Sequence, residues 1–272
     1  MEETVLAVVA NYAFSENADA LKASLKPYYK TLLIDNSSPS TPRTADVILP
    51  NRRYTGLWNA SVRLALEHHK PWLLFAASDV LIPETDLLAS CIQTVLKNPS
   101  VGIYTPSLRA DSRLSYPACF HRGTGKLREC FVTEGFFFLA RTDILARLYP
   151  ISVESNRFGF GIDLMSAYHA YRTGHRVIVD DRVVIYHPAA VHDTPAGMAV
   201  EEQMKYLGPE GRRFREWAIR RQQREGWLRE APRRWARAFS RPILRKLYSF
   251  LKYKSSFLKL FAFLFTNIIF IF

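Results

Sequence analysis

Cysteine is scarce in this chain of 272 residues, which contains only Cys91, Cys119 and Cys130. An odd number of cysteines at irregular spacing fits neither a disulfide framework nor a zinc motif. Buried or free thiols in a reducing compartment are the simplest interpretation. The N-terminus, Met1-Glu-Glu-Thr, also lacks the positive charge of a secretory signal, and its apolar run Val5–Ala10 is short. We therefore expect a cytoplasmic protein.

Acidic residues become rare towards the C-terminus. From Gly211 onward the chain has 16 Lys or Arg against 3 Asp or Glu, whereas residues 1–210 contain 21 and 22. The net charge of +12 therefore belongs to the tail. Such asymmetry predicts a tail that meets an anionic surface. No recognisable nucleic-acid module accompanies it, so nucleic acid is not an expected partner.

No apolar run in the tail is long enough to span a bilayer. Leu260–Phe272 is uncharged over 13 residues, whereas a spanning helix needs about 20. Bulky apolar residues recur at helical spacing from Phe250 to Ile268, with Lys252 and Lys259 on another face. This pattern favours a helix in the headgroup region of a membrane. The alternatives are a helix docked on its own domain or on a partner subunit, and a re-entrant or spanning segment.

The sequence pattern of the rest of the chain predicts one layered domain. Short apolar strands are expected at Val5–Ala10, Thr31–Ile34, Ala45–Leu49, Trp72–Ala77 and Val101–Thr105, with helices from about Ser15, at Leu57–His69 and at Pro83–Lys97. This alternation predicts an α/β fold with a largely parallel sheet. Further on, we expect a polar loop or hairpin at Arg109–Arg128, strands at Gly135–Ala140 and Arg176–Tyr186, and helices at Thr142–Leu148 and Asp163–Tyr171. Residues 1–200 would form the domain and residues 201–272 a helical basic tail.

Polar side chains follow three of these strands directly. Asn11, Asp35 and Asp79 each stand where a buried strand ends. Because ligands of open α/β sheets bind at the carboxyl ends of the strands, we expect these residues at one site.

Five stretches in this order resemble the GT-A glycosyltransferases, in particular the family 2-like group of the bacterial surface-polysaccharide type. They are Val8–Tyr12, Leu33–Ser38, Asn51–Asn59, Leu74–Val80, and Glu134–Leu139 followed by Gly159–Asp163. The resemblance covers roughly residues 4–190. It implies a Rossmann-like fold and inverting transfer of a sugar from a nucleotide-diphosphate donor to a glycan or lipid-linked acceptor. Surface polysaccharide or lipopolysaccharide synthesis on the inner face of the cell membrane would suit the basic tail.

The resemblance assigns the donor nucleotide to a set of mostly polar residues: Asn11, Asp35, Asn51, Gly56, Asn59 and Ser78. A carboxylate such as Asp35 suits base or ribose recognition because it offers only acceptors. The alternative is that Asp35 caps the turn formed by the following Asn-Ser-Ser-Pro sequence. Gly56 would permit close backbone approach, or simply precede a helix.

A divalent cation, Mg²⁺ or Mn²⁺, is implied at Asp79, which matches the last carboxylate of the family's Asp-x-Asp motif. Ala77 replaces the first carboxylate, so the metal is expected to bind weakly or to need another ligand. His187, at the end of a strand, is the candidate for that ligand. The alternatives are a helix-capping role for Asp79 and a structural role for His187.

The resemblance makes Asp163 the catalytic base, which takes the proton of the acceptor hydroxyl. Ile162 stands where the family has a second acid, and a helix N-cap is the alternative role for Asp163. Glu134 and Arg157 are candidates for acceptor binding. Two rival functions remain. One is a nucleotidyltransferase, although Asn11–Asn17 lacks the Gly, Lys or Arg of its phosphate-binding loop. The other is an inert membrane-bound scaffold, which the replacement of acidic residues by Ala77 and Ile162 favours.

Overall fold

The computed structural model describes residues 1–112, 116–188 and 201–221. One compact unit covers Met1–Ala218 and a second begins at Ile219. The expected tail helix around Phe250–Ile268 lies outside the described residues, and the predicted boundary at residue 200 stays a prediction. Within the described ranges, no helix combines the length and the apolar character that crossing a membrane requires.

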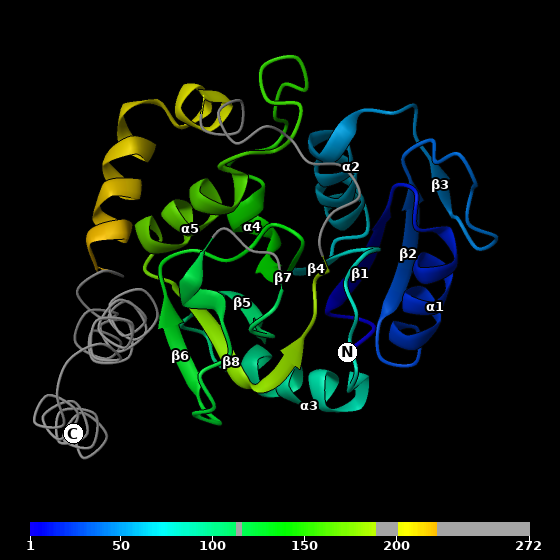
Figure 1. The fold of residues 1–272 in the computed structure, drawn as a ribbon, viewed down its shortest axis with the longest axis horizontal. Helices are drawn as coiled ribbons and strands as arrows, with labels where there is room; N and C mark the ends of the chain where they lie inside the picture. Colours follow the sequence, from blue (N-terminus) through cyan, green and yellow to red (C-terminus); the bar gives the residue numbers. More distant parts are fainter. Residues whose placement is uncertain (113–115, 189–200, 222–272) are drawn as a thin grey trace, which may run out of the picture. The chain divides into compact units, whose positions relative to one another are not determined.

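The N-terminal half alternates strand and helix (Figure 1). Its elements are β1 (Val5–Asn11), α1 (Ser15–Leu25), β2 (Lys30–Asp35), β3 (Val47–Ile48), α2 (Arg53–Glu67), β4 (Trp72–Ala77) and α3 (Thr85–Leu96). β1 is buried along its whole length because it lies between two strands and under helices, which is why its sequence is continuously apolar.

The C-terminal half inserts antiparallel strands. It consists of β5 (Val101–Leu108), the short 3₁₀ helix η1 (Pro117–Cys119), β6 (Leu127–Cys130), β7 (Phe137–Arg141), α4 (Thr142–Leu145), α5 (Ile162–Arg172) and β8 (Arg176–Ile185). Residues 201–221 are helical as well.

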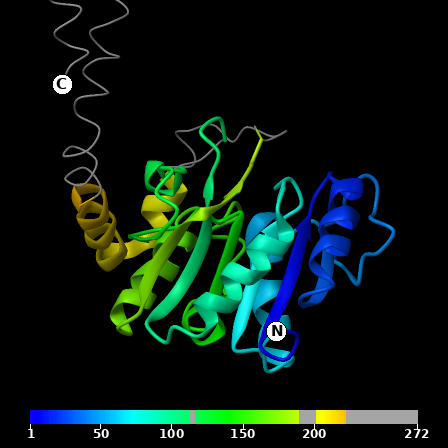
Figure 2. The same cartoon turned by 90° about the horizontal axis from the view of Figure 1, so that it is seen from below.

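All eight strands form one sheet in the order β3-β2-β1-β4-β7-β5-β8-β6. β1 pairs in parallel with β2 and β4, and β5 pairs in parallel with β8. β7 is antiparallel to both β4 and β5, and β6 is antiparallel to β8. Figure 2 shows the blue and green halves side by side. The expected largely parallel α/β sheet is thus confirmed, with two antiparallel strands that the alternation did not reveal.

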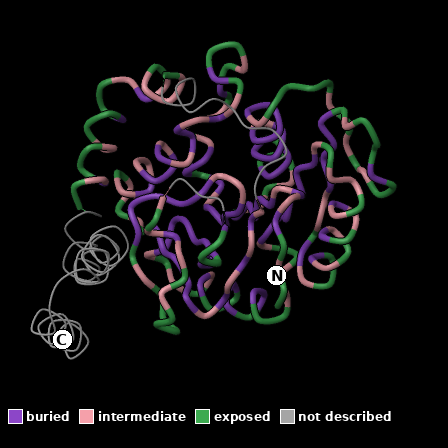
Figure 3. Tube along the Cα trace, in the orientation of Figure 1, coloured by how far each residue is buried: buried purple, intermediate pink, exposed green. Residues whose placement is uncertain are grey.

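The core follows the sheet, since buried segments run along the strands and exposed segments along the outer helix turns (Figure 3). Its largest fully buried side chains include Trp58, Tyr29, Tyr104 and Phe75. Phe75 of β4 stacks on Phe138 of β7 with ring centres 5.3 Å apart. The packing of aromatic side chains across this antiparallel pair holds the two halves of the sheet together.

Candidate functional site

A short bridge between distant segments forms the centre of the candidate site. Leu81 and Tyr186 exchange two backbone hydrogen bonds, of 2.8 and 3.0 Å, in an isolated antiparallel bridge. The bridge fixes the residues just after β4 against those just after β8. It therefore brings Asp79 and His187 together, although they are 108 residues apart.

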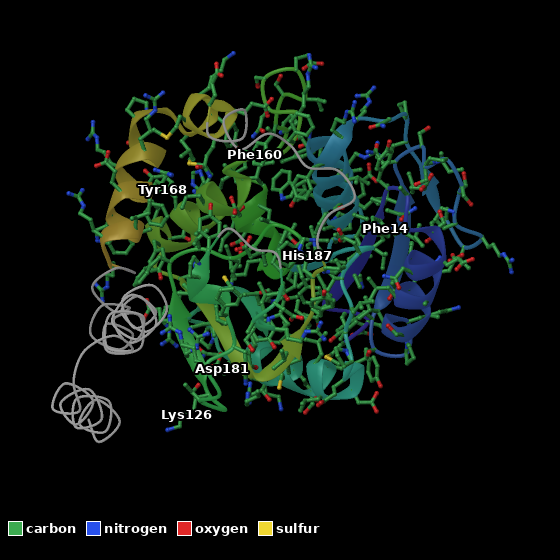
Figure 4. The ribbon with its side chains drawn as sticks, in the orientation of Figure 1. Phe14, Lys126, Phe160, Tyr168, Asp181 and His187 are labelled. Atoms are coloured by element: carbon green, nitrogen blue, oxygen red, sulfur yellow. The ribbon has the colours of Figure 1, made fainter. Side chains whose placement is uncertain are left out.

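His187 Nε2 lies 3.2 Å from Oδ2 of Asp79. The imidazole stacks on the ring of Phe136 at 3.9 Å between ring centres, and the His187 backbone N–H donates to Ser112 Oγ over 3.2 Å. These contacts fix the histidine ring, which Figure 4 labels in the interior of the molecule. The two side chains named from sequence as metal ligands are thus neighbours.

The chemistry of this pair fits a hard divalent cation. Oδ1 of Asp79 is buried, and among the described residues it has no hydrogen-bond partner. A buried carboxylate oxygen without a partner is costly unless a cation or a donor satisfies it. In the described part of the chain no third His, Cys, Asp or Glu joins the pair. Such a cation would take its remaining ligands from donor phosphates and water, as Mg²⁺ commonly does.

Asp163 lies in the first turn of α5. The residue before the helix is Gly161, whose φ of 84° favours glycine, and no side chain caps the helix N-terminus. Asp163 is therefore not the N-cap, which was the structural alternative for it. Its Oδ1 accepts a hydrogen bond of 2.8 Å from the N–H of Leu164.

The surroundings of Asp163 suit a general base. Burial raises the pKa of Asp163 to about 6, although the hydrogen bond from Leu164 N–H and the nearby side chain of Tyr116 favour the charged form. The carboxyl lines a small cavity with Tyr54, Thr133, Gly135 and Ser166. A base with a pKa near neutrality is ionised at pH 7 and still able to hold a proton.

Glu134 is buried close to this base. Its Oε1 accepts a hydrogen bond of 2.5 Å from the backbone N–H of Tyr116. Tyr116 therefore contacts Glu134 directly, its side chain also lowers the pKa of Asp163, and the sequence analysis did not identify it. The buried position of Glu134 shows that any acceptor reaching it must enter the protein interior next to Tyr116.

The segment Thr133–Phe136 joins the two parts of the site. Thr133 and Gly135 line the cavity at Asp163, whereas the ring of Phe136 stacks on His187. The Phe136 carbonyl accepts a hydrogen bond of 2.8 Å from Ala77 N–H, at the end of β4. The candidate base and the Asp79–His187 pair are therefore positioned by one stretch of backbone.

Asn11 and Asp35 form a closed network at the ends of β1 and β2. Asn11 Nδ2 donates to Asp35 Oδ1 over 2.8 Å, and Asp35 also accepts from the backbone N–H and the hydroxyl of Ser38. Both residues are fully buried. Asp35 thus closes the turn that follows β2, which was its structural alternative, and its contact with a nucleotide stays a prediction.

The other residues predicted to bind the donor nucleotide divide into two groups. Asn51 lies beside Asn36, whose Nδ2 is 3.4 Å from Asn51 Oδ1, and Ser78 accepts a bond of 2.7 Å from Asn17 at its carbonyl. Both therefore lie close to strand ends. Asn59 instead uses both amide atoms on the backbone of Ile151, over 2.7 and 3.0 Å. It anchors α2 to the loop after α4, and its proposed nucleotide contact stays a prediction.

Gly56 and Arg157 lie at the start of α2. A Cβ on Gly56 would stand 2.2 Å from the Cβ of Arg52, so helix packing requires glycine here. The side chain of Arg157 is exposed, and its carbonyl accepts a bond of 3.3 Å from Thr55 N–H. The predicted roles of Gly56 in donor binding and of Arg157 in acceptor binding are not tested by these contacts.

Solved structures with the same architecture include three that contain sugar nucleotides or their parts. TarS of S. aureus in complex with UDP-GlcNAc has a TM-score of 0.55 at 13% identity, covering 84% of this chain and 78% of that one. GalNAc-T7 with UDP, GalNAc and Mn²⁺ has a TM-score of 0.55 at 9% identity, covering 75% of this chain. Glucosyl-3-phosphoglycerate synthase of Mycobacterium tuberculosis with Mg²⁺ and UDP has a TM-score of 0.51 at 11% identity, covering 75% of this chain and 78% of that one.

The chain has the GT-A fold. It spans 47% of the GalNAc-T7 chain, so that protein contains much that has no counterpart here. No family model and no curated protein matches the sequence. At these sequence identities, the structural similarity confirms the GT-A fold predicted from the sequence. The family 2-like assignment stays a prediction.

Proposed function

We propose that this GT-A protein transfers a sugar from a nucleotide-diphosphate donor to a hydroxyl of a glycan or lipid-linked acceptor, with inversion. The observation that supports it most is Asp163, a half-buried carboxyl whose pKa is raised to about 6. The segment Thr133–Phe136 contacts both this carboxyl's cavity and His187 of the Asp79–His187 pair. A base next to a cation site is what this reaction needs.

In this proposal the residues have separate tasks. Asp79 and His187 would hold Mg²⁺ or Mn²⁺, which when bound neutralises negative charge on the diphosphate leaving group. Asp163 takes the proton from the attacking acceptor hydroxyl, and buried Glu134 accepts a hydrogen bond from a neighbouring hydroxyl of the acceptor. Asn11, Asp35, Asn51 and Ser78 stand at or near the strand ends where the nucleoside would lie, and Gly56 is proposed to approach it from the first turn of α2. Surface-polysaccharide synthesis is the proposed context.

Calorimetric titration with UDP-, GDP- and dTDP-sugars, with and without Mn²⁺, tests this function first. We expect one nucleotide to bind and Mn²⁺ to strengthen its binding. The Asp79–His187 pair alone provides few ligands for the cation, so the cation would also bind the phosphates of the donor. If none of the donors binds, the transferase proposal is wrong. Donor binding without transfer to any glycan or lipid-linked hydroxyl would favour the inert scaffold, for which Ala77 and Ile162 are the sequence indications.

We further propose that the tail holds the protein at the inner face of the cell membrane. Deleting Ser249–Phe272 should release the protein from anionic vesicles in a sedimentation assay, because the aromatic and basic residues that would enter the headgroup region are then lost. Donor binding should be unchanged. A variant with Lys252, Lys254 and Lys259 all changed to Glu serves as the charge control. Continued sedimentation of the truncated chain would show that the tail is not the anchor.

A further inference from the structure

Tyr54 contacts two glycines that come from different parts of the site. It is the second residue of α2, and its phenol donates a hydrogen bond of 2.5 Å to the carbonyl of Gly135. Its ring also lies against Gly159, where a Cβ would collide with the Cδ1 of the tyrosine. The same ring packs edge to face on Phe75 of β4, with ring centres 5.8 Å apart. Tyr54 is therefore supported by the core of the sheet and fills the space next to both glycines.

Gly159 belongs to the turn that begins α5. Its φ of 73° is in the left-handed region, which favours glycine. Its carbonyl accepts a hydrogen bond of 3.1 Å from the N–H of Ile162, the first residue of the helix. Asp163 is the next residue along. The place of the Tyr54 ring and the course of the turn before the candidate base therefore depend on each other.

Gly135 lies next to Glu134, the acid proposed to bind the acceptor. A Cβ on Gly135 would stand 2.9 Å from the hydroxyl oxygen of Tyr54 and 3.5 Å from its Cζ. Tyr54, Gly135 and Asp163 also line one cavity. The phenol thus reaches the segment Thr133–Phe136 at the point where that segment meets the cavity of the candidate base.

Thr55, the next residue of α2, holds the same loop. Its N–H donates to the carbonyl of Arg157 over 3.3 Å, and its buried hydroxyl donates to the carbonyl of Asn156. Asn156 in turn donates from Nδ2 to the carbonyl of Phe160 over 3.1 Å. These bonds fasten the loop before α5 to the first turn of α2, so they keep the Tyr54 ring in contact with its glycine in that loop.

We propose that Tyr54 is a positioning residue that sets the distance between the base Asp163 and the acceptor-binding acid Glu134. Its ring fixes the turn at Gly159, before the base, and its hydroxyl fixes Gly135, beside the acid. The inference rests on the proposed transfer reaction, because that reaction gives the two acids their roles. An acceptor that must reach both acids at once is sensitive to their spacing, since a misplacement of about 1 Å can cost about 100-fold in rate.

The test compares Tyr54→Phe with Tyr54→Leu in the full chain. Phenylalanine removes the bond to Gly135, and leucine also removes the ring that packs on Gly159. We expect kcat to fall about 10-fold in the first variant and about 100-fold in the second, with the donor KM unchanged in both. A tyrosine that only anchors α2 would instead raise the donor KM and leave kcat unaffected, since the proposed donor contact of Gly56 lies in the same turn.

Hydrogen exchange at the Ile162 amide reports on these contacts without turnover. This amide donates to the carbonyl of Gly159. In Tyr54→Leu the turn loses the ring that packs on it, so the amide should exchange faster than in the wild type. In Tyr54→Phe the ring remains, and exchange should stay close to that of the wild type.

Gly135→Ala tests the contact of the hydroxyl directly. The added methyl group pushes on the phenol of the wild type, but in combination with Tyr54→Phe it meets only Cζ at 3.5 Å, an ordinary contact distance. Gly135→Ala should therefore lower kcat in the wild type and have little further effect in Tyr54→Phe. Additive losses would show that the hydroxyl does not set the position of the segment.

Tyr171→Phe is the matched control. Tyr171 of α5 donates from its phenol to the carbonyl of Cys130 over 2.7 Å, so it too ties a helix to a backbone carbonyl shortly before the segment Thr133–Phe136. The control removes a bond of the same type. It should leave kcat and the exchange of the Ile162 amide unchanged.

The outcomes separate this inference from the proposed function. An unchanged kcat in Tyr54→Leu, or an equal loss in Tyr171→Phe, would overturn the positioning role. If Tyr54→Leu does not fold, additive losses between Gly135→Ala and Tyr54→Phe decide against it. If exchange changes as expected but the wild-type chain transfers no sugar, the contacts stand, and the proposed function is wrong together with the role of Tyr54 in it.

Discussion

Asp163→Asn should lose sugar transfer while keeping its affinity for the donor. Without the carboxylate no group takes the proton of the acceptor hydroxyl, and general-base contributions of this kind are typically about 10²–10⁴-fold in rate. The amide oxygen of asparagine can still accept the 2.8 Å hydrogen bond from Leu164 N–H, so the start of α5 should remain intact. Single-turnover transfer and calorimetric donor binding measure the two effects separately.

The same variant should be more stable than the wild type above pH 6. The pKa of Asp163 is about 6 in the folded protein, above its ordinary value of 3.8. The folded state therefore binds the proton more tightly than the unfolded state. Asp163 then costs no stability below about pH 4, and the cost grows as the pH rises to about 6 and stays constant above. Asparagine removes that cost, and we expect roughly 1–3 kcal/mol of added stability at pH 8 by denaturant unfolding.

Asp86→Asn is the control for both measurements. Asp86 also lies in the first turn of a helix, α3, and also accepts a hydrogen bond from a phenol, that of Tyr28. It is exposed and its hydrogen-bond partner, Tyr28, is not a candidate site residue, so neither transfer nor its pH dependence should change. If Asp163→Asn retains full activity, the assignment of the base is wrong. If its stability follows the pH profile of the wild type, Asp163 does not titrate as described.

Asp79→Ala should remove the part of donor affinity that depends on metal. With Mn²⁺ present, we expect the donor Kd to rise by about 100-fold, or nearly 3 kcal/mol, because a diphosphate loses the cation that neutralises it. Without metal, the variant and the wild type should bind the donor about equally weakly. Calorimetry at fixed donor and varied Mn²⁺ measures this difference. His187→Ala should act in the same direction.

Asp111→Ala is the matched carboxylate control. Asp111 follows β5 close to Ser112, which contacts His187, but it is exposed and paired with Arg109 at 2.6 Å. The variant should keep the metal-dependent affinity. Equal donor binding by Asp79→Ala and the wild type in Mn²⁺ would refute the cation site. It would leave the donor to be held by protein groups alone.

The sequence predicted the elements whose burial makes their pattern plain. β1 and β4 are buried nearly throughout, so their apolar runs identified them as strands. β6 was missed because Leu127 and Glu129 are exposed on an edge strand and no apolar run marks it. The insertion of antiparallel β7 between β4 and β5 depends on contacts across the whole chain. A local pattern carries no information on such an order of strands.

The candidate site was predicted where a residue ends a strand or opens a helix. Asp79, His187 and Asp163 have such positions, and the structure brings the first two into contact. Tyr116 could not be found in this way, since it lies in a polar stretch without periodicity and its partners are far downstream in the chain. At Asn59 the sequence missed a structural partner. Its side chain type suits nucleotide binding, but only the fold reveals that Ile151 occupies its amide.

The bridge between Leu81 and Tyr186 couples metal binding to the local folding of the two segments that it joins. The two candidate ligands meet only while the end of β8 is docked against the segment after β4. Any opening of that bridge separates them, so a cation that binds both must stabilise the docked state through linkage. The amide hydrogens of Leu81 and Tyr186 would then exchange more slowly as metal is added. Hydrogen exchange at these two amides reports on occupancy without any donor or acceptor present.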